Sequence, residues 1–152
     1  MEDKIKDAVK IERYKFILQE ISNLNSNTHK FLNLFQTLAT AIIGGAVLVF
    51  VNWKKLEISA DVAIASIRAL YWLLVILAIF LIIRVIANVF SWFDYRKEEV
   101  ELLKEIVDEN FRKPPTLKNI WRWDEFYIIL FILVVLIAII GFAEYYYIPV
   151  IN

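Results

Sequence analysis

Hydrophobic residues gather in three long runs, at residues 31–52, 69–93 and 126–145. A helix needs about 20 mostly apolar residues to cross the hydrocarbon core of a bilayer. Backbone in that core must satisfy its own hydrogen bonds, so each run should be helical. The pattern predicts an all-α integral membrane protein with three transmembrane helices.

A hydrophobic seam precedes the first run and continues into it with alternating steps of four and three residues. This spacing places side chains on one face of a helix. Ser and Asn are frequent between residues 22 and 28, and both are poor helix formers. The sequence therefore allows either one long helix or a helix that bends there. The seam consists of Ile17, Ile21, Leu24, Thr28, Phe31 and Phe35.

A second amphipathic stripe follows the second run, on a charged segment at residues 94–113. Nothing interrupts its helical spacing before Pro114 and Pro115, so we expect the helix to reach about Arg112. An apolar stripe on a soluble helix needs a partner. The candidates are the other cytosolic helix and a neighbouring subunit, and the candidate interface comprises Leu103, Ile106, Val107, Phe111, Ile17, Ile21 and Leu24.

These patterns divide a single domain into consecutive segments. Asp61 is a plausible N-cap for the second apolar helix. The expected segments are a cytosolic amphipathic helix (1–30), transmembrane helix 1 (31–53), a short outer loop (54–68), transmembrane helix 2 (69–93), a cytosolic helical extension (94–113), a linker (114–123), transmembrane helix 3 (124–147) and an outer tail (148–152).

Positive charges are distributed unevenly between the two sides of this arrangement. Lys and Arg number 13 before the first run and between the second and third, against 3 in the outer loop. Cytosolic loops carry the excess of Lys and Arg. We expect a multi-pass protein of the cell (inner) membrane with its N-terminus in the cytosol and its C-terminus outside.

Polar residues inside the apolar runs are the candidate functional residues. With the span boundaries above, Arg84 should lie at the depth of the polar residues in the first span, so that two polar stripes face each other or a shared aqueous cavity. A charged residue at such a depth is costly and is usually functional. Glu125 and Asp124 are its candidate ion-pair partners. The alternative is that the polar residues only hold helices together; besides Arg84, they are Asn88, Asn33, Gln36, Thr37 and Thr40.

The chain lacks the residues that several classes of function require. The chain has no cysteine and one histidine, His29, and 17 basic residues balance 17 acidic ones. It contains none of the short motifs that mark hydrolases or phosphate-binding loops. We expect no enzyme activity, no cofactor, no metal site and no nucleic-acid partner. The expected partners are the lipid bilayer, further copies of the chain and a possible soluble protein on the cytosolic side.

The helix layout of residues 2–113 resembles the small SLATT-type membrane modules of bacterial conflict and defence systems. That resemblance implies a pore-forming effector. The third apolar run is an addition to the two-span plan, and no functional residue is carried over. The sequence thus favours a small homo-oligomeric membrane effector or channel-like protein, gated or assembled by its cytosolic helices. The alternative is a non-conducting scaffold or accessory subunit that docks a soluble partner on those helices.

Overall fold

The computed structural model describes residues 2–108 and 110–151, and this part of the chain is helical without strands. Three of its helical stretches are long and apolar enough to cross a membrane, at Ile5–Asn52, Ala60–Ile106 and Asp124–Ile151. The predicted all-α class with three such helices is confirmed. The elements are α1 (Glu2–Asn52), α2 (Ala60–Ile106), η1 (Leu117–Arg122), α3 (Asp124–Phe142), η2 (Ala143–Tyr147) and α4 (Ile148–Ile151).

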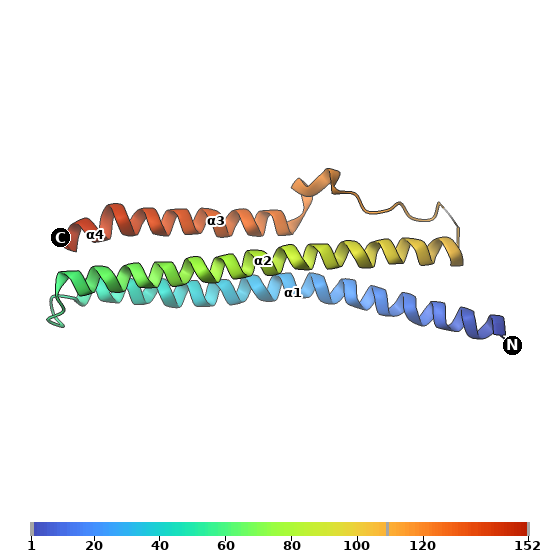
Figure 1. The fold of residues 1–152 in the computed structure, drawn as a ribbon, viewed down its shortest axis with the longest axis horizontal. Coiled ribbons are helices and arrows are strands. Elements are labelled where there is room, and N and C mark those ends of the chain that lie inside the picture. Colours follow the sequence, from blue (N-terminus) through green and yellow to red (C-terminus); the bar gives the residue numbers. More distant parts are fainter. Residues whose placement is uncertain (1, 109, 152) are drawn as a thin grey trace.

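Helices α1 and α2 form a long antiparallel hairpin (Figure 1). At 1.5 Å per residue, a helix of the 51 residues of α1 is roughly 76 Å long, more than twice the thickness of a hydrocarbon core. Helix α3 packs beside the half of α2 that is nearer the hairpin turn, and the two termini lie at opposite ends. We call the other half of the hairpin, residues 5–24 and 93–106, the stalk.

The hydrophobic seam of α1 faces α2, as predicted. Ile17, Ile21, Thr28 and Phe35 are all buried. Helix α1 is unbroken through the Ser- and Asn-rich stretch and changes direction slightly near it (Figure 1), so the chain forms one long, gently bent helix. Packing along a continuous seam outweighs the poor helix propensity of these residues.

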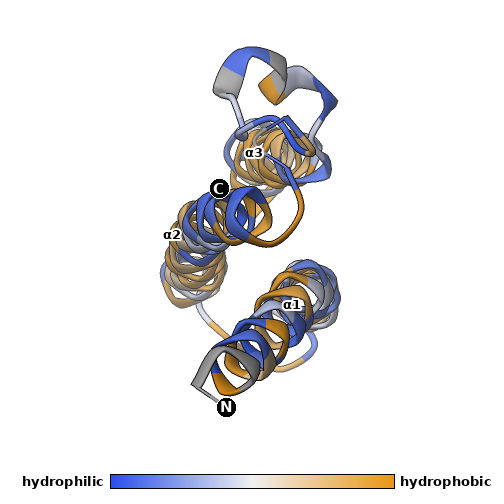
Figure 2. Cartoon of the chain, turned by 90° about the vertical axis from the view of Figure 1, so that its right-hand side faces the viewer, coloured by the Kyte–Doolittle hydropathy of each residue, from blue (hydrophilic) through white to orange (hydrophobic). Residues whose placement is uncertain are grey.

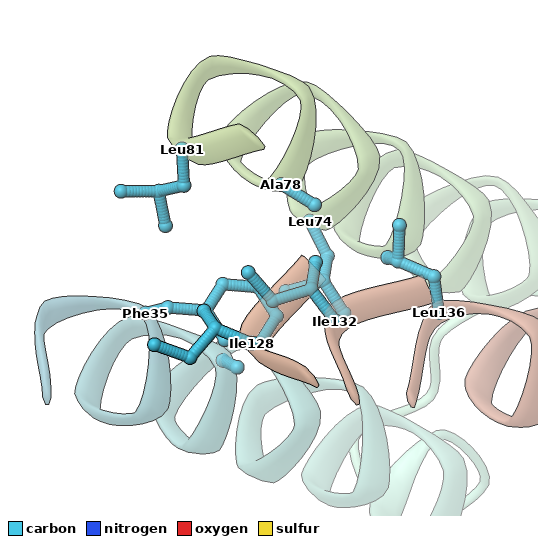
Figure 3. Close-up of a cluster of buried hydrophobic side chains, with 8 residues drawn as sticks. Phe35, Leu74, Ala78, Leu81, Ile128, Ile132 and Leu136 are labelled. Carbon is cyan, nitrogen blue, oxygen red and sulfur yellow. The ribbon is translucent and has the colours of Figure 1, made fainter. Parts of the chain in front are cut away.

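The core lies where the three helices meet (Figure 3). Phe35 and Ala39 of α1 pack with Leu81 of α2 and Ile132 of α3 in one buried cluster. A second cluster near the hairpin turn joins the start of α2 to the end of the chain, through Ile67 and Ile148 among others.

The hairpin turn is shorter than the predicted outer loop of residues 54–68. Helix α1 ends at Asn52 and α2 already begins at Ala60, so most of the predicted loop is the first part of α2. Ser59 and not Asp61 occupies the N-cap position. Asp61 lies in the first turn, where its negative charge is favourable near the positive end of the helix dipole.

Helix α2 ends at Ile106, before the predicted end near Arg112. The Asn110 backbone N–H donates to Asp108 Oδ1 at 2.7 Å, and the Phe111 N–H donates to the Asp108 carbonyl at 3.2 Å. An aspartate that binds the backbone two residues ahead forms a turn that competes with the helix. This turn ends the helix before the prolines do.

The third apolar helix continues beyond its predicted end at residue 147. It passes through a π-helical turn, Ala143–Tyr147, and continues as α4 through Ile151, so residues 148–151 are not an extended tail. The Ile148 N–H donates to the Ala143 carbonyl, a spacing of five residues. Proline clashes with the carbonyl four residues before it, and the wider π turn before Pro149 relieves that clash.

Candidate functional site

Arg84 lies at the edge of the apolar part of the bundle. Its guanidinium is 5.3 Å from the centre of the Phe31 ring, and Phe31 is the first residue of the first apolar run. Gln36 and Thr40 lie five and nine residues further along α1, or roughly 8 and 14 Å. The predicted common depth of Arg84 with these residues is therefore wrong. The early start of α2 shifts the register of the hairpin and moves Arg84 outward.

Arg84 does not meet its predicted partners. Glu125 and Asp124 instead line a pocket of about 330 Å³ together with Thr28, His29 and other residues. Among the ion pairs of the described side chains, none includes Arg84. Arg84 is exposed beside Phe31, whereas the two carboxylates lie in the first turn of α3.

Asn88 holds α1 and α2 together. Its Nδ2 donates to the Leu24 carbonyl at 2.7 Å and to Thr28 Oγ1 at 2.8 Å. Thr28 is only 3% exposed. This is the arrangement of a polar contact between helices rather than of a group that lines a cavity.

The polar residues of α1 face away from the bundle. We call Asn33, Gln36, Thr37, Thr40 and Gly44 the polar stripe, and all five are exposed. Successive helical residues are about 100° apart. By that rotation Asn33, Thr37 and Gly44 point roughly opposite to Phe35 of the buried seam. The two predicted polar stripes therefore do not face each other within one copy of the chain.

Two side-chain amides of this stripe make no hydrogen bond to the described part of the chain. Thr37 Oγ1 donates to the Asn33 carbonyl at 3.0 Å, so its hydroxyl is satisfied within α1. The side chains of Asn33 and Gln36 have no hydrogen-bond partner among the described residues. A Cβ added at Gly44 would meet no atom within 4 Å, so the backbone there is open to a close neighbour.

The cytosolic interface residues fall into two groups. Ile17, Ile21 and Leu103 are buried, and Leu24 is partly covered, so the stalk helices cover each other as one alternative predicted. Three residues at the end of α2 and just beyond it stay uncovered: Ile106 at 42%, Val107 at 56% and Phe111 at 61% exposure.

Glu99 is the main polar site that the sequence pattern did not indicate. It lies in a run of acidic residues that is typical of a solvated helix face, yet its side chain is 0% exposed. Arg96 Nη1 binds Glu99 Oε2 at 2.6 Å and Arg112 Nη1 binds Glu99 Oε1 at 2.7 Å. The only sequence signal is the helical spacing of Arg96 and Glu99. The contact with Arg112 requires the chain to fold back after α2.

A second charged cluster lies near the hairpin turn. Arg68 donates through Nε and Nη2 to the two carboxylate oxygens of Glu144, both at 3.2 Å, and the Tyr71 hydroxyl donates to Glu144 Oε1 at 2.6 Å. These bonds join α2 to the π turn η2. The described residues contain no group of three His, Asp or Glu side chains placed to share a metal ion.

No known protein family, curated protein or solved structure matches this chain.

Proposed function

We propose that this chain is a small homo-oligomeric membrane protein of the channel-like or effector type. The polar stripes of several α1 helices face one another in the assembly and line its polar path. The observation that carries this proposal is the exposure of the stripe on the side of α1 away from α2.

The distribution of charge supports the insertion of all three helices in a bilayer. Charged residues are absent from residues 31–52 of α1, 69–83 of α2 and 126–143 of the third helix. These lengths correspond to roughly 33, 22 and 27 Å of helix, against about 30 Å of hydrocarbon. The ends of these stretches meet in the structure, with Arg84 beside Phe31 and Arg68 beside Glu144.

The excess of Lys and Arg orients the assembly in the membrane. The N-terminus, the stalk and the segment between α2 and α3 lie in the cytosol. The hairpin turn and the C-terminus lie outside the cell membrane. In this orientation the polar stripe starts at the cytosolic edge and reaches towards the middle of the bilayer.

Lipid is a poor environment for the polar stripe. An amide moved into hydrocarbon without a hydrogen-bond partner costs about 4 kcal/mol or more. Neighbouring polar stripes, or water between them, would satisfy Gln36 and Asn33. Thr40 and Gly44 form a small-xxx-small pair, which allows helix backbones to approach closely. Self-association through this face therefore removes an unfavourable exposure and provides good packing.

The resemblance in helix layout to SLATT-type modules agrees with this proposal. It supports a role as a pore-forming effector of bacterial defence that acts without enzymatic chemistry. The stalk is then the part that assembles or gates the pore, because it is the part of the hairpin outside the lipid.

The absence of cysteine in the chain permits a direct test. The Thr40→Cys variant is reconstituted in liposomes, and ion flux is measured before and after a water-soluble thiol reagent. We expect modification and loss of flux. Ile76→Cys is the matched control, because Ile76 lies at about the depth of Thr40 and is 63% exposed, on α2. It should remain unmodified.

Three results would contradict the proposal. They are the absence of flux in the unmodified protein, equal labelling of the two variants, and a monomeric mass in mild detergent. Flux that the reagent blocks only in Thr40→Cys would support a water-filled path along α1.

The second candidate function is a non-conducting scaffold that binds a soluble partner. The exposure of Ile106, Val107 and Phe111 favours it. In that case Val107→Glu with Phe111→Glu releases the partner while liposomes remain impermeable. Flux through the unmodified protein, unchanged in the double variant, would favour the channel instead.

A further inference from the structure

The segment between α2 and α3 is basic and aromatic. Residues 110–123 contain Arg112, Lys113, Lys118 and Arg122 and no acidic residue. Two tryptophans lie at its end, Trp121 and Trp123. Lys and Arg beside a membrane helix attract anionic lipids, and tryptophan prefers the depth of the headgroups.

The charges of this segment are not all equivalent. Arg112 is held by the buried Glu99. Lys113, Lys118 and Arg122 are exposed, and the ion pairs of the described side chains include none of them. Three cations are therefore available to an external anion.

The segment carries apolar groups beside these cations. Trp121 is 68% exposed and Ile120 is 40% exposed on η1. Trp123 packs instead against the bundle, with its ring centre 5.8 Å from that of Trp92 and 5.3 Å from that of Phe93. The Trp123 contact fixes one end of η1. The Trp121 ring contacts the Phe126 ring, with centres 4.7 Å apart, but Trp121 and Ile120 both keep an exposed face that can enter a lipid surface.

The position of η1 suits such a surface. It ends at Arg122, just before α3 begins at Asp124. Figures 1 and 2 show η1 and the chain before it on the outer side of the bundle, away from α1. In the membrane placement proposed above, the start of α3 marks the cytosolic headgroup layer, so Lys118, Arg122 and Trp121 lie near that depth. Lys113 lies further into the cytosol, because its neighbour Arg112 is held by Glu99 of the stalk.

We propose that residues 118–122 form a binding site for the anionic phospholipids of the cytosolic leaflet. Lys118 and Arg122 bind the phosphate groups, while Trp121 and Ile120 insert among the acyl chains below them. The site rests on the proposed membrane placement but not on ion conduction. A cation near an anionic surface strengthens binding by roughly fivefold.

The test uses the whole chain in lipid nanodiscs. Thr116 is exposed beside η1, and a Thr116→Cys variant carries an environment-sensitive dye as the only thiol label. Phosphatidylglycerol is raised from zero to 40% in phosphatidylcholine. We expect the emission to shift to the blue as anionic lipid increases, and to return at about 0.5 M salt because of screening.

Two charge variants separate this site from general electrostatics. The midpoint is the phosphatidylglycerol fraction at which half of the emission shift has occurred. The Lys118→Gln, Arg122→Gln double variant should move this midpoint beyond the highest phosphatidylglycerol fraction. Lys97→Gln with Lys104→Gln removes the same number of charges from exposed positions of the stalk, and should leave the midpoint unchanged.

Equal changes of the midpoint in the two charge variants would contradict the proposed site. An emission in pure phosphatidylcholine equal to that with phosphatidylglycerol would contradict it as well. If soluble inorganic phosphate reversed the emission shift, the cations would form a site for free phosphate and not for a lipid surface. Failure of the chain to enter nanodiscs would contradict the membrane placement itself. The absence of ion flux would affect only the proposed function.

Discussion

At residue 99 a carboxylate is buried completely between two guanidinium groups. A charge removed from water is tolerated only when opposite charges and hydrogen bonds replace the hydration. Arg96 is 20% and Arg112 43% exposed, so the two cations keep contact with solvent while the anion between them has none. Glu99 thereby fixes the chain after α2 against the stalk.

Removal of this charge should destabilise the protein strongly. Glu99→Gln leaves the guanidinium of Arg96 partly buried without its counter-ion, and we expect a loss of about 3 kcal/mol in the free energy of unfolding. Unfolding in mixed detergent, followed by circular dichroism, measures the change.

Glu98→Gln is the matched control for this prediction. Glu98 pairs with Arg13 across the stalk, but the two side chains are 39% and 48% exposed. An exposed pair contributes at most about 1 kcal/mol. If Glu98→Gln were as unstable as Glu99→Gln, the burial of Glu99 would not increase its contribution to the free energy of unfolding.

At the scale of the helices, spacing in the sequence predicts which residues share a face. The step pattern of Ile17, Ile21 and Phe35 predicted the seam correctly, because one apolar face must pack somewhere. The same rotation places Asn33, Thr37 and Gly44 opposite that seam. Their outward orientation could therefore be predicted from the sequence, although the sequence analysis expected them to face α2.

The register between helices was harder to predict. The depth of Arg84 depends on where the hairpin turns, and the turn is set by packing around Ile58 and Ile64 rather than by a strong local signal. The end of α2 depends on Asp108, and the chain beyond it is held by the contact between Glu99 and Arg112, two residues that are 13 positions apart. Periodicity carries no information about such contacts.

The tie between α2 and the π turn gives a prediction about elements. Glu144→Arg places two cations together, so the end of the third helix should separate from α2 and thermal stability should fall. The swap Arg68→Glu with Glu144→Arg should recover much of that loss. Because the pair is 49% and 32% exposed, we expect a coupling energy of about 0.5–1 kcal/mol.

A double-mutant cycle of thermal unfolding in detergent provides the measurement. The Tyr71→Phe variant is its companion, because it removes the bond from the hydroxyl to Glu144 and keeps the ring. If the swapped variant is no more stable than Glu144→Arg, the two charges do not interact across the helices.

At the scale of the whole molecule, the three membrane crossings proposed above would place the two ends of the chain on opposite sides of the bilayer. The stalk lies at one end of the structure, the hairpin turn and the C-terminus lie at the other, and η1 lies between them beside the start of α3. The cations follow this division, since the stalk and the segment before α3 carry most of them. In the proposed assembly, the long stalks of several copies would provide a surface for control outside the lipid.

Single cysteines in this cysteine-free chain test that arrangement in intact cells. Leu56→Cys and Val150→Cys lie in the hairpin turn and in α4, where the native side chains are 63% and 62% exposed. A membrane-impermeant maleimide should label both without lysis. Glu12→Cys on the exposed face of the stalk should be labelled only after the membrane is opened. Labelling of Glu12→Cys and Val150→Cys from the same side would require an even number of crossings. The proposed depth of the polar stripe in the bilayer would then be wrong. The proposed position of the anionic-lipid site in the cytosolic leaflet would be wrong as well.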